Sequence, residues 1–207
     1  MKKIDIENWN RKEHYNFFSS LDDPYWSITT QLECTHAYNE AKKSGTSFFL
    51  KYLHSTLWAV NEIEALKMRI VDDEIHCYDT INASATILRD DETFGCCFIE
   101  YTTDFNQFES NAQKQIAKTK CRQGMCLEMD YMLNQIHFST IPWVKFSALT
   151  YAKSLSTQDT VPKITFGKYY KENNKMLIPI SVQVNHALVD GIHVAKLLDK
   201  LQAKLRL

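Results

Sequence analysis

Hydrophobic residues recur at two different spacings along the chain, and these predict a mixture of helices and strands. Spacings of three and four residues run through segments 11–21, 47–63, 104–120 and 191–205, which we expect to be helices. The clearest case is the last segment, whose apolar positions are Val194, Leu197, Leu198, Leu201 and Leu205. Each helix should place its apolar face against a core.

The other apolar segments are short and rich in β-branched and aromatic residues, which is typical of strands. Asp72 and Asp73 predict a hairpin turn between two of them. Runs of adjacent strands broken by helices favour a two-layer α/β sandwich, with a mixed β-sheet and helices on one face. The expected strands are segments 25–33, 68–70, 75–78, 93–102, 136–141, 143–151, 163–169 and 176–184.

Composition narrows the class of protein. Five glycines, four prolines and no low-complexity stretch mark no linker, so residues 1–207 are expected to form a single domain. The 24 basic and 25 acidic residues leave a net charge of -1, which makes nucleic acid an unexpected partner. No signal-like segment and no apolar run of roughly 18 residues occurs, so we expect a cytoplasmic protein without membrane contact. The six cysteines lack paired C-x-x-C units, which favours reduced thiols.

The candidate chemistry lies near the end of the chain. His186 follows an apolar strand, and its imidazole, with an ordinary pKa near 6.5, suits removal of a hydroxyl proton at neutral pH. The alternative is a structural histidine at a strand end. Asp190, directly before Gly191 and an amphipathic segment, is well placed to cap the last helix.

Two further features leave alternatives open. Ser139 ends an apolar stretch, so its hydroxyl can point into a cleft or bond to neighbouring backbone. His186, Asp190 and His193 could form a metal triad, but no fourth ligand is suggested nearby and His193 can simply begin a helix. No metal is therefore expected.

Several segments together carry a family resemblance. Residues 185–191 fit the pattern x-His-x-x-x-Asp-Gly, which is found in a known enzyme superfamily. Gln183 and His193 beside them fit one branch of that superfamily more closely. Segments 8–15, 91–94, 139–144 and 166–170 match that same branch in the same order. The chain resembles the chloramphenicol acetyltransferases, which belong to the coenzyme A-dependent acyltransferase superfamily.

The resemblance implies an O-acetyltransferase that moves an acetyl group from acetyl-CoA to a hydroxyl of chloramphenicol, by direct transfer in a ternary complex. Acetyl-CoA would be a co-substrate, and no cofactor would be bound permanently. The resemblance also implies a homotrimer with active sites at the subunit interfaces. Two alternatives remain: the same chemistry on another hydroxylated xenobiotic or metabolite, and a non-catalytic trimeric protein that only binds the drug.

The resemblance also assigns roles to individual residues. His186 would be the base, Ser139 would stabilise the oxyanion, and an ion pair between Asp190 and Arg11 would orient the turn. Thr165 would hold a water near the oxyanion. The remaining positions are Phe17 and Phe18 for the acceptor pocket and Lys168 and Tyr169 for the coenzyme.

Alternatives also exist for these binding residues. The two phenylalanines can form a core face of the first helix, and the lysines around Tyr169 can belong to a solvated hairpin. Asn185 departs from the family, which usually carries a second histidine before the base. Asp22 departs as well, because relatives tend to be apolar in that stretch.

Overall fold

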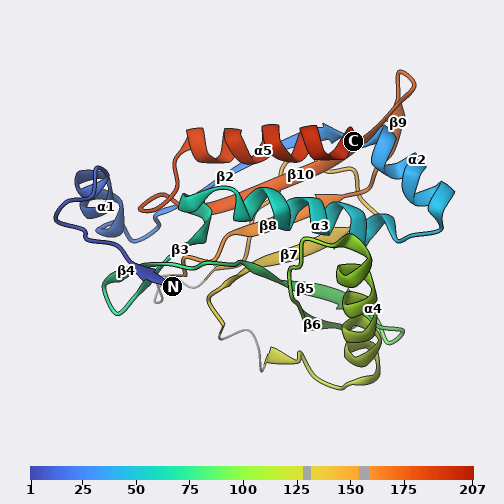
Figure 1. The fold of residues 1–207 in the computed structure, drawn as a ribbon, viewed down its shortest axis with the longest axis horizontal. Coiled ribbons are helices and arrows are strands. Elements are labelled where there is room, and N and C mark those ends of the chain that lie inside the picture. The colour runs from blue at the N-terminus through green and yellow to red at the C-terminus, as the bar shows by residue number, and fades with distance from the viewer. Residues whose placement is uncertain (128–131, 154–158) are drawn as a thin grey trace.

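A large mixed sheet forms the centre of the molecule. The computed structural model describes residues 1–127, 132–153 and 159–207. In these ranges seven strands pair in the order β2-β10-β8-β7-β5-β6, with β9 beside β10 (Figure 1). Strands β5, β7 and β8 run parallel, and the other pairs are antiparallel. The strands are β2 Tyr25–Glu33, β5 Asn82–Leu88, β6 Phe94–Ile99, β7 Gln135–Ile141, β8 Lys163–Gly167, β9 Tyr170–Glu172 and β10 Lys175–Asn185.

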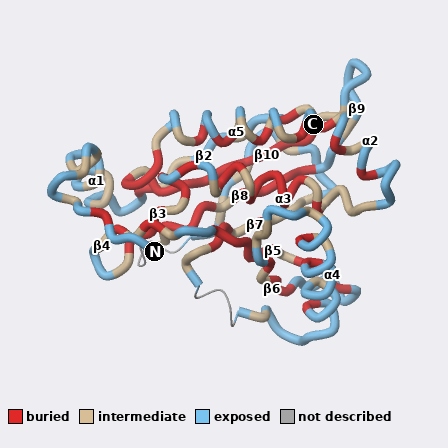
Figure 2. The backbone as a smooth tube through the Cα atoms, viewed as in Figure 1, coloured by how far each residue is buried: buried red, intermediate tan, exposed pale blue. Residues whose placement is uncertain are grey.

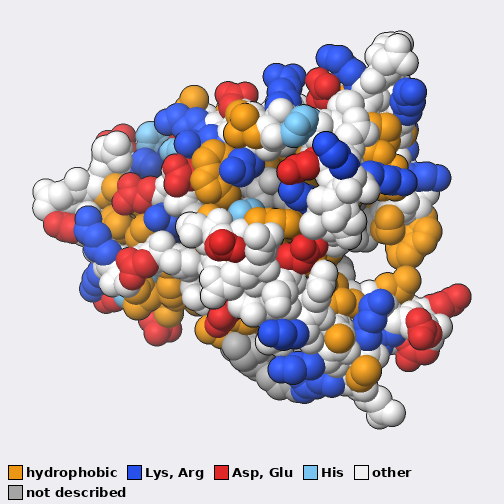
Figure 3. Space-filling model, turned by 45° about the vertical axis from the view of Figure 1, so that its right-hand side comes forward, with side chains coloured by type: hydrophobic (Ala, Val, Ile, Leu, Met, Phe, Trp, Pro, Cys, Tyr) orange, Lys and Arg blue, Asp and Glu red, His pale blue; other side chains and the backbone are white. Residues whose placement is uncertain are grey.

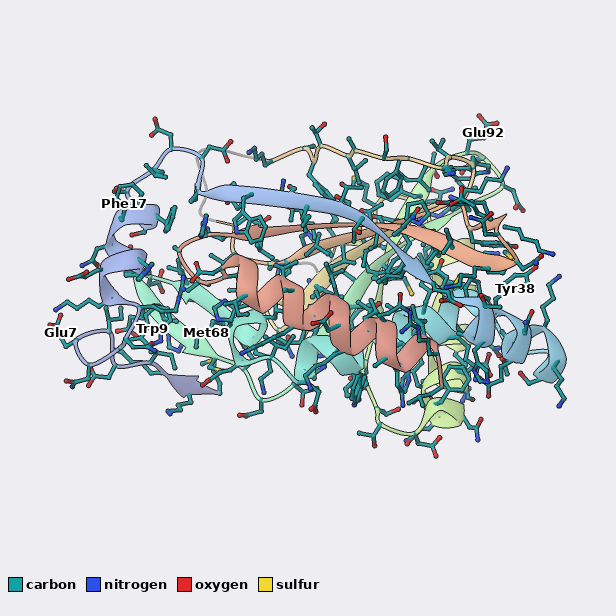
Figure 4. All side chains as sticks on the ribbon, turned by 90° about the horizontal axis from the view of Figure 1, so that it is seen from above. Glu7, Trp9, Phe17, Tyr38, Met68 and Glu92 are labelled. Atoms are coloured by element: carbon teal, nitrogen blue, oxygen red, sulfur yellow. The ribbon has the colours of Figure 1, made fainter. Side chains whose placement is uncertain are left out.

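Helices cover one face of this sheet, as Figure 4 shows from above. Helix α3 (Phe48–Asn61) is the most buried, because Leu50, Leu53 and Leu57 all face the core. Helix α5 (Gly191–Leu205) lies beside it and buries its predicted apolar positions except Leu198, which packs at the core's edge. The other helices are α1 Lys12–Ser19, α2 Thr35–Ser44, α4 Phe105–Cys121 and the short 3₁₀ helix η1 Glu64–Lys67. The predicted α/β sandwich is confirmed.

A small second sheet joins the N-terminus to this core. It has the order β1-β4-β3, with β1 Lys2–Lys3, β3 Met68–Val71 and β4 Glu74–Cys77. Asp72 and Asp73 have φ of 49° and 62°, so the hairpin turn predicted there is present and uses the left-handed region. Buried residues run continuously through both layers (Figure 2).

Residues 142–153, which follow β7, pass over the sheet face opposite the helices. There the Tyr151 hydroxyl donates to the backbone carbonyl of Ser181 at 2.9 Å. Thr165 and Ser181 are consequently buried although none of the described helices lies on their side. This arrangement leaves room for a cavity between the segment and the sheet.

The strand expected over residues 143–151 was wrong. Pro142 cannot donate to a strand ladder, and the chain turns there, with the Val144 N–H donating to the Ile141 carbonyl at 3.2 Å. Trp143 is 64% exposed, so its apolar character does not reflect burial in a sheet. The irregular path is what allows this segment to cross the face of the sheet.

Two of the longer elements, β5 and α2, have no counterpart in the sequence prediction, and neither do the short elements β1, β9 and η1. Strand β5 is fully internal to the sheet, but its small residues give little β-propensity. Helix α2 buries only Ala37 and Ala41, so its apolar stripe is too thin to detect. In the described part of the chain, no helix is both long enough and apolar enough to cross a bilayer.

Candidate active site

The turn after β10 carries His186 and is fixed by backbone contacts. The His186 N–H donates to the Pro24 carbonyl at 2.7 Å, which ties the turn to the start of β2. Asn185 Oδ1 accepts the Ala187 N–H at 2.9 Å, and its carbonyl accepts from Leu188 and Val189. Asn185, the departure from the family pattern, therefore supports the turn with its own side chain.

Two aromatic rings enclose the His186 imidazole. The Phe18 ring stacks on it with centroids 3.8 Å apart and planes at 7°, and the Trp26 ring lies at 5.6 Å. Trp26 is held in place because its Nε1–H donates to the Val189 carbonyl at 3.0 Å. This burial lowers the pKa of His186, and the charges of Arg11 and His14 lower it further. The imidazole is thus neutral at pH 7.

An ion pair joins the two ends of the chain beside this imidazole. The Arg11 guanidinium donates to Asp190 through both terminal nitrogens, Nη1 to Oδ2 and Nη2 to Oδ1, the latter at 3.0 Å. Nη2 also donates to the His186 carbonyl at 3.3 Å. The two side chains are only 12% and 27% exposed, so water screens the electrostatic attraction between them only weakly. The His186 Nδ1 lies 3.2 Å from Asp190 Oδ1.

Ser139 lies at the middle of the sheet, on the face away from the helices. It is opposite Thr165 in the β7/β8 ladder, and Thr165 is opposite Ser181 in the next one. The Thr86 hydroxyl donates to Ser139 Oγ at 3.2 Å. Ser139, Thr165 and Thr86, together with Tyr151 and its neighbours, line a cavity of about 450 Å³.

Within one chain His186 and Ser139 are far apart. His186 follows β10 five residues beyond Ser181, which at about 3.3 Å per residue is ~16 Å along the strand. Ser139 lies two strands away from β10, another ~10 Å across the sheet. The separation is therefore roughly 19 Å. One small substrate cannot touch both side chains of the same chain.

A second cavity, of about 680 Å³, opens among α2, α3 and the ends of β5 and β7. Tyr169 lines it, with its ring 5.1 Å from Tyr38 and 5.6 Å from Phe48. Figure 3 turns this end of the molecule forward and shows hydrophobic side chains beside lysines and arginines around a notch. Both cavities share four lining residues, so they meet at the sheet: Thr86, Leu88, Thr140 and Pro142.

Not all of the predicted binding residues lie in the cavities. Lys168 does not line the second cavity, whereas Lys42 and Lys120 do, and sequence reasoning singled out neither of them. Phe17 is 61% exposed at the end of α1 and touches Phe18 edge to face, at 5.1 Å and 82° (Figure 4). It therefore does not belong to the core.

His193, the third member of the possible metal triad, has a different partner. Its Nδ1 accepts the Asp190 N–H at 2.9 Å in the first turn of α5. Among residues 1–127, 132–153 and 159–207, no group of three or more His, Cys, Asp or Glu side chains is arranged to hold a metal ion.

The fold is found in a solved structure of low sequence similarity. A solved dihydrolipoamide acetyltransferase from Azotobacter vinelandii superimposes with a TM-score of 0.69 over 94% of this chain and 86% of its own, at 12% identity. At that identity the likeness concerns the fold alone.

The sequence places the chain more narrowly. The family profile described as chloramphenicol acetyltransferase matches residues 1–202. Chloramphenicol acetyltransferase 3 of Escherichia coli is 30% identical, over 97% of this chain and 94% of the relative. A relative from Campylobacter coli is 31% identical, over 97% and 96%. A solved chloramphenicol acetyltransferase superimposes with a TM-score of 0.91 at 31% identity, covering 99% of this chain and all of that one. The chain belongs to the chloramphenicol acetyltransferase family and is an acyltransferase.

Proposed function

We propose that the protein transfers an acetyl group from acetyl-CoA to the primary hydroxyl of chloramphenicol. The observation that carries this proposal is the neutral, partly buried His186 held beside the Arg11–Asp190 ion pair. The names of the similar proteins supply the acceptor. Residues 1–207 would act as one acetyltransferase domain, in line with a core that extends from Ile4 to Leu205.

In the proposed reaction His186 is the general base. Its Nδ1 is buried on the Asp190 side, which leaves Nε2 to take the proton of the acceptor hydroxyl. The oxygen then attacks the thioester carbonyl. As the tetrahedral intermediate collapses, the carbon–sulfur bond breaks and the proton passes from His186 to the departing coenzyme A thiolate. No acetyl-enzyme is needed, because a ternary complex already aligns both reactants.

Ser139 would stabilise the oxyanion of that intermediate. Since Thr86 donates to Ser139 Oγ, the Ser139 proton is available to the developing negative charge. Thr165, opposite Ser139 and buried, would hold a water beside the same oxyanion. Thr86 would thus be a positioning residue for the serine.

The second cavity would bind the coenzyme. Its cluster of Tyr38, Phe48 and Tyr169 offers ring faces to the adenine, and Lys42 and Lys120 offer charge to the phosphates. Lys168 would contact the coenzyme only from outside the cavity. The junction at Thr86 and Thr140 would let the thioester reach Ser139.

The acceptor would bind where two copies of the chain meet. Because His186 and Ser139 are roughly 19 Å apart in one chain, a base from one subunit must act with a serine from another. This supports a homotrimer with interfacial active sites, as a closed cyclic assembly can repeat one heterologous interface. Phe17 and Phe18 beside the base would face the aryl group of the drug.

The test is release of free thiol from acetyl-CoA, with chloramphenicol and a panel of other acceptor alcohols. We expect chloramphenicol-dependent thiol release and a product acetylated at the primary hydroxyl. Release with a different alcohol alone would replace the acceptor but keep the transferase. Tight chloramphenicol binding with no thiol release for any alcohol would indicate a binding protein instead.

A further inference from the structure

The first turn of α5 is closed by a histidine. His193 lies three residues after Asp190, and its Nδ1 accepts the Asp190 N–H at 2.9 Å. An imidazole nitrogen accepts a hydrogen bond only when it carries no proton. The bond therefore requires neutral His193 with its proton on Nε2.

This bond fixes a residue that other contacts rely on. The Asp190 carboxylate receives both terminal nitrogens of Arg11, and Arg11 Nη2 reaches the His186 carbonyl. A shift of the Asp190 backbone would move the ion pair, and with it the turn that carries His186. His193 thus acts on His186 through two intermediates and contacts no substrate.

The surroundings of His193 keep it neutral. Burial lowers its pKa, and the positive charges of Arg11 and Lys196 lower it further. A cavity of about 630 Å³ separates it from the end of α3 and from η1. Charged groups also line that cavity: Glu62, Glu64 and Lys200. Protonation would break the Asp190 bond and add a cation beside Arg11.

We propose that His193 is a positioning residue for acetyl transfer, whose neutral imidazole fixes Asp190 and through it the Arg11–His186 contact. The inference rests on the proposed function. It predicts that protonation of His193, in addition to protonation of His186, lowers activity in acid. Because protonation of His193 should cost about tenfold in addition to the loss of the base, log kcat should steepen toward a slope of two per pH unit where both groups titrate and return to one at lower pH.

Three variants separate this role from simple packing. In His193→Asn the amide oxygen can take the place of Nδ1 but does not titrate. His193→Gln keeps the amide but carries its oxygen one methylene further, and His193→Ala removes the acceptor. We expect His193→Asn to keep kcat within about threefold of wild type at pH 8, and His193→Gln and His193→Ala to lose about tenfold through misplacement of the turn. KM for acetyl-CoA should stay unchanged in all three.

The pH profile gives the decisive readout. The acid limb of log kcat should steepen toward two in wild type and stay at one in His193→Asn. Nitrogen chemical shifts of labelled wild-type protein should place the His193 proton on Nε2. Equal slopes, or equal losses in the Asn and Gln variants, would overturn the inference. If His193→Ala does not fold, the Asn and Gln pair still decides. A wild-type protein without acetyl transfer would instead refute the proposed function.

Discussion

The surroundings of His186 and of Ser139 are built in opposite ways. Ser139 is held by the parallel ladders of central strands, where Phe138 and Ile164 on the other face are fully buried. His186 lies beyond the end of a strand and is positioned by residues from the distant N-terminus, namely Arg11, Phe18 and Pro24. The serine's position is thus part of the core's stability, whereas the base's position depends on a few polar and stacking contacts. Changes around His186 should therefore affect catalysis more than folding.

The largest expected effect comes from removing the base. His186→Ala should lower kcat by roughly 10²–10⁴, because proton removal occurs in the transition state. In the wild type, kcat should fall as pH drops through the His186 pKa, which lies below the ordinary value, since protonation abolishes the base. Thiol-release kinetics against pH measure both effects.

The control for this variant is coenzyme binding and thermal unfolding, both of which should match wild type. Burial also lowers the pKa of His193, so the unfolded state binds more protons than the native one just below pH 6.5. The free energy of unfolding should consequently fall as the pH drops below about 6.5. The activities of the variants must therefore be compared above that pH. Retention of more than about a tenth of the activity would rule out His186 as the base.

A smaller loss of activity is expected from a change at Ser139, in the central strands of the sheet. Ser139→Ala should lower kcat by roughly 10²–10³ with little change in stability, because one oxyanion donor is lost and the ladders remain. Thr86→Val is the matched comparison: it removes only the hydroxyl that orients the serine and should cost less.

Mixing the two inactive variants tests whether the regions meet across subunits. When His186→Ala and Ser139→Ala chains are unfolded together and refolded, about a quarter of heterologous interfaces should combine an intact base with an intact serine. Activity should return to about a quarter of wild type. A mixture no more active than its components would place both groups in one chain's site.

A smaller loss than at His186 or Ser139 is expected at the ion pair. Arg11→Ala and Asp190→Ala should each lower kcat by roughly 10–100-fold, since the turn is misplaced by a fraction of an ångström to 1 Å. The double variant should lose little more than either single one, because both changes remove the same contact. Fully additive losses in a double-mutant cycle would show that the pair does not act as a unit.

Several elements could be anticipated from local patterns, and others could not. The helical spacing in 191–205 and the Asp-Gly before it suffice for α5 and its start, because both signals lie within the helix itself. The path of residues 143–151 could not be anticipated from the sequence. Their apolar side chains lie in a segment that crosses one face of the sheet and does not pair with a strand. Lys42 was missed because α2 has too little apolar surface to be recognised.

The sequence by itself determined the family, the sandwich fold and the identities of the chemical groups, because motifs and periodicity are local properties of the chain. Only the tertiary structure decided that Phe18 stacks on His186, that Asn185 supports the turn, and that the His193 Nδ1 accepts the Asp190 N–H. It alone also placed Ser139 roughly 19 Å from His186. Those facts depend on which distant segments the sheet brings together, and no local spacing encodes the distance between the ends of two strands.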